Sequence, residues 1–268
     1  MLAAAASDDQ NLHRNRQHYV RALRHVNACV QFLALVPGGN QWFDSRRLSA
    51  PMPTSNNASG PLSLEEITRI LLPYGGKALT DSQLAHFARY LELLKRWNQT
   101  IPLTSIQDDT EIVARHFGES IFADALLPMT GGRLADVGSG AGFPGLPLKI
   151  AFPELQITLL EPNIKKCAFL REVQSTLGLF GVEIVRNRYE DLHVPPGSFD
   201  FVCARALGGY KRLLLWARTV LKPEGHVILW LGTEDSNVLT RVRGWHWALP
   251  AKIPESRQRV LLMGTPRP

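Results

Sequence analysis

The chain has 268 residues, of which 45% are hydrophobic and 20% charged, and a formal net charge of +6. This composition is typical of a soluble globular protein, and no apolar run approaches the roughly 18 residues that span a bilayer, so we expect no membrane association. The positive charge favours polyanionic partners, because Lys and Arg neutralise phosphates. The three cysteines lack zinc-binding spacing, so we expect no metal site and interpret them as reduced thiols of a cytoplasmic protein.

Residues 1–60 differ in composition from the rest of the chain. They end in "RRLSAPMPTSNNASGP", which is dense in Ser, Asn and Pro and is typical of a linker. An earlier stretch, "HYVRALRHVNACVQFLALV", fits one amphipathic helix, and the arginines around it are compatible with a targeting peptide, an RNA-contacting arm or a dispensable extension. We predict that residues 1–60 are a poorly ordered extension or linker.

Residues 61–130 are predicted to be a small helical region. The pairs at 63–66 and 80–83 fit the capping box, in which a hydroxyl and an acid or amide satisfy the free N–H groups at a helix start. After the second box, apolar residues recur every three or four positions up to about Asn98, which indicates a helix with one face in the core. A third helical stretch is expected over about 108–127.

From residue 131 onward, short apolar runs alternate with helical patterns. This alternation predicts a parallel sheet with crossover helices, and the uninterrupted Val, Ile and Leu in the runs indicate burial on both faces. The last run, "QRVLLMG", is predicted to be an antiparallel edge strand. We therefore expect residues 131–268 to form an α/β domain with a Rossmann-like, mostly parallel sheet that binds the cofactor.

The segment "LADVGSGAGFPGLPL" begins with the first predicted strand and continues into a glycine-rich turn. Glycines permit positive φ and let a ligand approach the backbone. The glycines fit both a methyltransferase GxGxG and a dinucleotide GxGxxG pattern, but Asp136 would repel a pyrophosphate and suits the positive charges of S-adenosylmethionine. We therefore favour S-adenosylmethionine over NAD, with these candidate binding residues: Asp136, Gly138, Ser139, Gly140, Gly142 and Phe143.

Further candidates follow the next three predicted strands. Glu161 ends the second strand, where an acid reaches the hydroxyls of a ribose. Tyr189 and Glu190 follow the third strand, and Arg205 ends the fourth, where side chains face the transferred group; a simple ion pair with a nearby acid is the alternative for Arg205. The candidates for phosphate contact are Arg115, His116, Lys165, Lys166, Arg188, Arg241 and Arg243, although Lys165 and Lys166 fit a solvent-exposed helix face equally well.

Over about residues 63–265 the chain resembles the bacterial methyltransferases that modify guanine N7 in small-subunit ribosomal RNA, the glucose-inhibited division protein B family. The resemblance rests on "RYLELLKRWNQTIPLTSI", "IVARHFGES", "DVGSGAGFPGLPL", "TLLEPNIKKCAFLREV", "RYEDL", "FDFVCARAL" and "LKPEGHVILWLG". It implies a class I methyltransferase fold, S-adenosylmethionine as cofactor and 16S ribosomal RNA as substrate. Carried over by position, it places the adenine beside Tyr189 and Glu190, and Arg205 near the methyl group.

The chain departs from the family at three places. Pro102 stands where the family usually has Asn, Leu231 where it has Lys or Arg, and Glu119 where Asp is common. The first two remove polar groups on the presumed RNA side.

The chemistry expected at guanine N7 is simple, because N7 has a free lone pair and carries no proton. Attack on the sulfonium methyl therefore needs no general base, and catalysis is mostly positioning, with Arg205 orienting the base or a phosphate. We expect a monomer that acts on naked or partly assembled 16S ribosomal RNA. Three alternatives remain open at this point: a small-molecule methyltransferase, an NAD-dependent oxidoreductase and a non-catalytic RNA-binding assembly factor.

Overall fold

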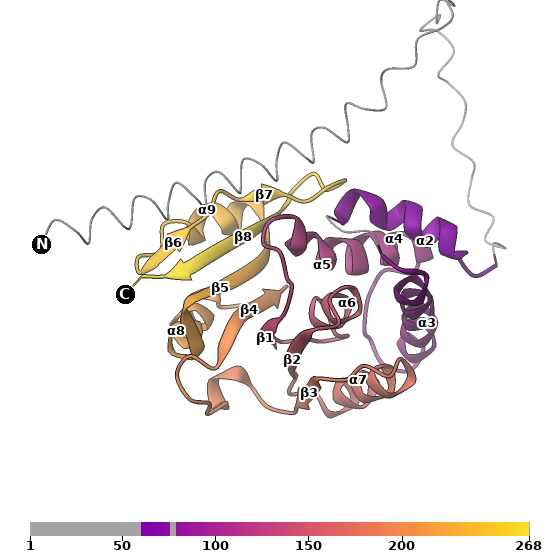
Figure 1. Cartoon of the computed structure of the whole chain (residues 1–268), viewed down its shortest axis with the longest axis horizontal. Coiled ribbons are helices and arrows are strands. Elements are labelled where there is room, and N and C mark those ends of the chain that lie inside the picture. The colour runs from indigo at the N-terminus through magenta and orange to yellow at the C-terminus, as the bar shows by residue number, and fades with distance from the viewer. Residues whose placement is uncertain (1–59, 76–78, 268) are drawn as a thin grey trace, which may run out of the picture. The chain divides into compact units, whose positions relative to one another are not determined.

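The computed structural model describes residues 60–75 and 79–267, so the predicted extension at residues 1–60 lies outside the described residues except for Gly60 (Figure 1). The described part contains an eight-stranded sheet in the order β3-β2-β1-β4-β5-β8-β6, with β7 paired to β8. Its strands are β1 Gly132–Val137, β2 Leu155–Leu160, β3 Val182–Val185, β4 Phe199–Arg205, β5 Leu221–Gly232, β6 Trp245–Trp247, β7 Ala251–Lys252 and β8 Arg259–Pro266.

Strands β1 to β5 are parallel, which confirms the predicted α/β class with a Rossmann-like, mostly parallel sheet. Within the sheet, the chain runs from β1 through β2 to the edge strand β3. It then crosses back to β4, which lies on the other side of β1. Such a reversal leaves a crevice at the carboxyl ends of the strands, between β1 and β4. The fold therefore directs a ligand to the turn that follows β1.

The last apolar run forms β8, which is antiparallel to β5 as predicted but is not the edge of the sheet. Strand β6 pairs with its other side. Gly264 permits this arrangement, because a Cβ atom there would lie 2.6 Å from the ring of Trp247. The edge position predicted for this run was wrong, because three residues between 245 and 247 are too short a pattern to identify as a strand.

The helices are α2 Leu64–Leu71, α3 Asp81–Asn98, α4 Asp109–Ile112, α5 Glu119–Ile121, α6 Gly145–Ala151, α7 Ile164–Thr176, α8 Tyr210–Val220 and α9 Thr233–Leu239. Both predicted capping boxes are present, at the starts of α2 and α3. None of these described helices is long and apolar enough to cross a bilayer. The helix expected over 108–127 is interrupted instead: a π-helix at Val113–Gly118 separates α4 from α5, and a 3₁₀-helix follows at Phe122–Ala125.

Two hydrophobic clusters cover the two faces of the sheet. Helices α2, α3, α6 and α7 belong to the cluster on one face, and α8 and α9 to the cluster on the other (Figure 1). The apolar stripe of α3 packs into the first cluster through Phe87, Tyr90 and Leu94. Its Gln83 side chain also donates hydrogen bonds of 2.8 Å to the carbonyls of Ile150 and Ala151, at the end of α6. Helix α3 therefore supports the helix that follows the glycine turn.

Candidate functional site

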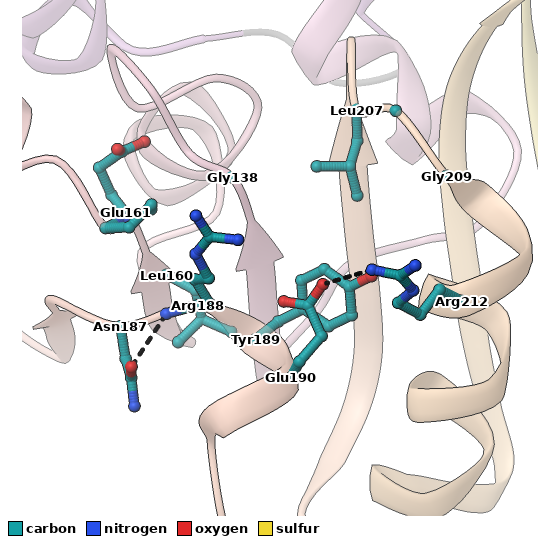
Figure 2. A pocket seen from close by; sticks show the side chains of 12 residues that line it. Gly138, Leu160, Glu161, Asn187, Arg188, Tyr189, Glu190, Leu207, Gly209 and Arg212 are labelled. Carbon is teal, nitrogen blue, oxygen red and sulfur yellow. Dashed lines mark hydrogen bonds and ion pairs between the residues drawn. The ribbon is translucent and has the colours of Figure 1, made fainter.

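A pocket of about 370 Å³ opens at the carboxyl ends of the parallel strands (Figure 2). It is lined by residues at the end of β2 or after β1, β2, β3 and β4, and by one residue of α8, namely Gly138, Leu160, Glu161, Pro162, Asn187, Arg188, Tyr189, Glu190, Leu207, Gly208, Gly209 and Arg212. The structure thus brings together five of the residues predicted from the sequence: Gly138, Glu161, Arg188, Tyr189 and Glu190. Parallel sheets bind ligands at this place.

Glu161 forms part of the pocket wall and is fixed there by backbone donors. Its side chain is buried, and its two carboxylate oxygens accept hydrogen bonds from the N–H groups of Gly140 at 2.9 Å and Asn163 at 2.8 Å. Each carboxylate oxygen has a second lone pair. Glu161 can therefore accept hydrogen bonds from a ligand without leaving its backbone partners.

Two glycines of the turn face the protein and not the pocket. A Cβ atom at Gly142 would lie 2.6 Å from both the Tyr90 hydroxyl and the Leu146 side chain. At Gly145 it would lie 2.5 Å from Leu159. These two glycines are required by packing, which differs from the close approach of a ligand that the sequence suggested for the turn as a whole.

The other two glycines leave the backbone accessible. Gly138 and Gly140 have φ angles of +70° and +58°. A Cβ atom at Gly140 would have no neighbour closer than 3.8 Å, and at Gly138 it would meet only the side chain of Leu207, at 3.3 Å. Close approach of a ligand to this turn is therefore expected at Gly138 and Gly140.

Asp136 lies behind the turn. Its side chain is fully buried, accepts a hydrogen bond of 3.0 Å from the N–H of Gly145, and is not part of the pocket lining. Burial raises its pKa to about 7. Asp136 therefore anchors the start of α6, and its predicted contact with a positively charged ligand stays a prediction.

Ser139 and Phe143 also support the turn from within and do not line the pocket. The Ser139 hydroxyl donates to the backbone carbonyl of Asp136 at 3.0 Å, and the Phe143 ring stacks on His116 with 4.5 Å between ring centroids. These contacts hold the shape of the turn, and direct contact of Ser139 and Phe143 with the cofactor stays a prediction.

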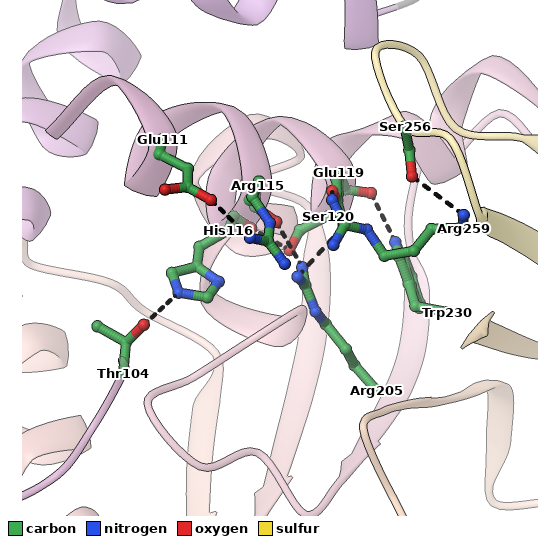
Figure 3. A network of polar contacts seen from close by, with 10 residues as sticks. All are labelled: Thr104, Glu111, Arg115, His116, Glu119, Ser120, Arg205, Trp230, Ser256 and Arg259. Atoms are coloured by element: carbon green, nitrogen blue, oxygen red, sulfur yellow. Dashed lines mark hydrogen bonds and ion pairs between the residues drawn. The ribbon is translucent and has the colours of Figure 1, made fainter. Parts of the chain in front are cut away.

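Arg205 makes an ion pair with a nearby acid, and its predicted place near the transferred methyl group stays a prediction. Its guanidinium donates to the carbonyl of Arg115 at 2.7 Å and lies 3.2 Å from the carboxylate of Glu119, which also pairs with Arg259 (Figure 3). Burial raises the pKa of Glu119, and the nearby guanidiniums oppose that shift. Arg205 is not among the residues that line the pocket.

His116 cannot serve as a cation at neutral pH. Burial and the neighbouring arginines lower its pKa to about 3, and its ring is hydrogen-bonded to the Thr104 hydroxyl at 2.7 Å. Among the other predicted phosphate contacts, Arg115 pairs with Glu111 at 2.5 Å, and Arg188 is exposed at the rim of the pocket. Lys165, Arg241 and Arg243 are exposed, and Lys166 is partly buried.

Arg212 is a pocket residue that the sequence did not single out. It lies in the first turn of α8 and forms a 4.0 Å ion pair with Glu190 (Figure 2). Gly209, just before α8, has a φ of +78°. The two glycines in "LGG" could therefore have indicated a turn at this position, and this turn faces the pocket. Leu231 and Pro102, two departures from the family, lie elsewhere: Leu231 is buried in the core, and the backbone after Pro102 is held by the side chain of Asn98.

Comparisons of the sequence with a family model and with curated proteins indicate one family. Residues 83–243 match the family model described as rRNA small subunit methyltransferase G, GidB. The chain is 38% identical over 183 residues to the ribosomal RNA small subunit methyltransferase G of Roseiflexus castenholzii, which covers 67% of this chain and 78% of that protein. The protein of the same name from Yersinia pseudotuberculosis is 38% identical over 170 residues, covering 63% of this chain and 81% of its own length. The chain therefore belongs to the rRNA small subunit methyltransferase G family.

Proposed function

We propose that this protein transfers the methyl group of S-adenosylmethionine to N7 of a guanine in 16S ribosomal RNA. The observation that carries the proposal is the pocket at the carboxyl ends of β1 to β4 in a chain of this family, with the Glu161 carboxylate on its wall and an accessible backbone at Gly138 and Gly140.

The hydrogen bonds of the glycine turn favour S-adenosylmethionine over a dinucleotide. A dinucleotide site uses free N–H groups of the turn and helix start to bind the pyrophosphate. In this chain those N–H groups already have protein acceptors: Gly138 and Ser139 donate to the Leu160 carbonyl, Gly140 to Glu161, Gly142 and Phe143 to the Ser139 carbonyl, and Gly145 to Asp136. The turn therefore suits a ligand without phosphate groups.

Different residues of the pocket are proposed to hold different parts of the cofactor. In this proposal Glu161 accepts hydrogen bonds from the ribose hydroxyls, and Tyr189 and Glu190 lie beside the adenine, which is supported by their position in the lining of the pocket. Gly138 and Gly140 allow the ligand to lie against the backbone. S-adenosylmethionine supplies the chemistry as an electrophilic methyl group on a sulfonium.

In the reaction at N7, the protein mainly has to position the guanine against the methyl group. The acceptor nitrogen has no proton to remove, so no side chain is needed as a general base. N7 faces the major groove, which is too narrow in A-form RNA for side chains to enter, so the target guanine lies in a loop or an opened strand. A cytoplasmic monomer acting on naked or partly assembled small-subunit RNA fits this requirement.

Transfer of labelled methyl from S-adenosylmethionine to 16S ribosomal RNA, taken from cells that lack their own N7 enzyme, tests the proposal. We expect label in a single 7-methylguanosine. Glu161→Ala should abolish the transfer at low cofactor concentration, whereas Glu183→Ala, an exposed change on β3, should leave it unchanged. Cofactor binding by the wild type without label in any RNA would contradict the proposed substrate.

A further inference from the structure

A second group of polar side chains, shown in Figure 3, includes none of the residues that line the pocket. We call it the arginine cluster and define it by Arg115, His116, Glu119, Arg205 and Arg259. It combines the π-helix, the end of β4 and the start of β8. His116 joins the cluster to the turn, because its ring stacks on that of Phe143.

The π-helix contributes to how the cluster is built. The N–H of Glu119 donates to the carbonyl of Ala114, which is one residue further back than in a regular α-helix. The carbonyl of Arg115 accepts a hydrogen bond from Arg205 at 2.7 Å. π-helical segments are frequent at functional sites, where they place side chains that a regular helix would turn away.

The cluster carries more positive than negative charge. Its three guanidiniums face two carboxylates: Glu119 is shared by Arg205 and Arg259, and Glu111 pairs with Arg115. His116 adds no charge at neutral pH. Even when Glu111, which lies outside the cluster as defined, is counted, one positive charge is left without a counterion.

Unpaired polar atoms are concentrated at the same place. In the described part of the chain, six buried side-chain nitrogen or oxygen atoms have no hydrogen-bond partner, and four of them belong to the cluster: Arg115 Nε, His116 Nδ1, Arg259 Nε and Glu119 Oε2. Glu119 Oε2 is nevertheless ion-paired with Arg205 at 3.2 Å. Buried polar groups are normally paired, so the three nitrogens indicate a missing partner. The two guanidinium nitrogens can only donate, and the excess charge is positive, so the missing partner is an anionic acceptor.

We propose that the arginine cluster binds an oxyanion of the substrate complex, namely a phosphate of the RNA strand that carries the target guanine. Planar guanidiniums bind phosphate oxygens in pairs, and fixing a phosphate beside the glycine turn would hold the strand in register with the pocket. The proposal rests on the proposed function, because it requires an RNA substrate. The carboxylate of the amino-acid part of S-adenosylmethionine has the same chemistry, and the experiment distinguishes the two sources.

The test measures binding of 16S ribosomal RNA by the cofactor-saturated full chain over a range of salt concentrations. Arg259→Gln should lower the affinity about threefold or more and reduce the slope of log K against log salt by about 0.7 to 0.9, the value for one phosphate contact. Arg259→Lys should keep the slope. Arg257→Gln removes an exposed arginine two residues away and should change neither quantity.

Calorimetric titration of the same variants with S-adenosylmethionine identifies the source of the oxyanion. An unchanged cofactor Kd supports the RNA phosphate, whereas an increase of about tenfold with an unchanged salt slope assigns the oxyanion to the cofactor carboxylate. If the cofactor Kd and the salt slope of RNA binding in Arg259→Gln both equal those of the wild type, the proposal is overturned.

Two controls separate this outcome from other failures. Arg259→Gln leaves the buried Glu119 with fewer partners, so the double variant with Glu119→Gln, which removes that charge, is measured in parallel and replaces the single variant if the latter melts early. A wild type that binds no RNA would refute the proposed function, and the cofactor titration would still test the cluster.

Discussion

Tyr90 holds the cofactor turn from behind. Its hydroxyl donates to the carbonyl of Ala141, and its buried ring packs on Phe117 and Phe143 at centroid distances of 5.1 and 5.7 Å. Because this hydroxyl occupies the space beside Gly142, a residue some 50 positions upstream in the chain decides which glycines of the turn are free to meet a ligand.

Alanine substitutions should separate the two kinds of glycine. Gly142→Ala combines a φ of +91° with a clash against Tyr90, so we expect a loss of about 2 kcal/mol or more of unfolding free energy. Gly140→Ala has only the positive φ to accommodate, at about 1 kcal/mol, but its methyl group faces the open side and should weaken S-adenosylmethionine binding. Denaturant unfolding and cofactor titration measure both effects; equal losses of stability would contradict this assignment.

Asp136 should make the stability depend on pH. Its pKa is raised from 3.8 to about 7 in the fold, so between these values the folded state binds a proton that the unfolded state has released. The free energy of unfolding therefore falls as pH rises through this window and levels off above it, with a total effect on the order of a few kcal/mol.

Asp136→Asn tests this expectation, because the amide oxygen can still accept from Gly145 but does not titrate. The difference in free energy of unfolding, variant minus wild type, should increase from pH 5 to pH 7. Urea unfolding at each pH measures it. Asp235→Asn, an exposed change, should show no such trend. A constant difference between Asp136→Asn and the wild type would exclude the raised pKa.

The side of the sheet that the Asp136 carboxylate faces could not be predicted from the sequence. Its place at the end of β1 was predictable from the apolar run before it. Both faces of β1 are covered, so the residues before and after Asp136 are equally buried, and the alternation that normally distinguishes two faces is missing. Which side the carboxylate faces was therefore not available from the local pattern.

At the scale of elements, the capping box of α3 also joins two helices. Gln83 accepts the N–H of Thr80 and donates to two carbonyls at the end of α6, whereas Glu66 in the box of α2 bonds, among the described residues, only to Ser63. Gln83→Ala should therefore cost about 2–3 kcal/mol, because it leaves two buried carbonyls unpaired, and Glu66→Ala about 0.5–1 kcal/mol. Thermal or denaturant unfolding measures both, and similar losses would show that the bonds to α6 contribute nothing.

Capping boxes and buried strands were predictable because their signals are local. The π-helix was not, since "VARHFGES" has a sequence compatible with a regular helix. The carbonyl of Arg115 is bonded to Arg205, 90 residues further along the chain. Contacts at such a separation leave no trace in the periodicity of either segment.

At the scale of the whole molecule, the fold and the family predicted from the sequence are confirmed. The pocket residues were predictable in large part, because the ends of parallel strands meet at one edge. The arginine cluster was only partly predictable: Arg259 reaches Glu119 because β8 runs antiparallel beside β5, which is a property of the assembled sheet.

Cofactor binding should stabilise the entire fold. S-adenosylmethionine at 100 times its Kd adds about 2.7 kcal/mol to the free energy of unfolding, which corresponds to an increase in Tm of about 5–10 °C for a domain of this size. NAD at the same concentration should give no increase. A Tm that rises with NAD and not with S-adenosylmethionine would reverse the choice between the two cofactors.

The short outer strands of the sheet affect how the protein behaves at high concentration. The sheet ends at β3 with four residues on one side and at β6 with three on the other. Trp245 and Trp247 of β6 stack on each other, with 5.5 Å between ring centroids. Strands this short offer few unpaired backbone groups to a neighbouring molecule, so the sheet gives little template for edge-to-edge aggregation.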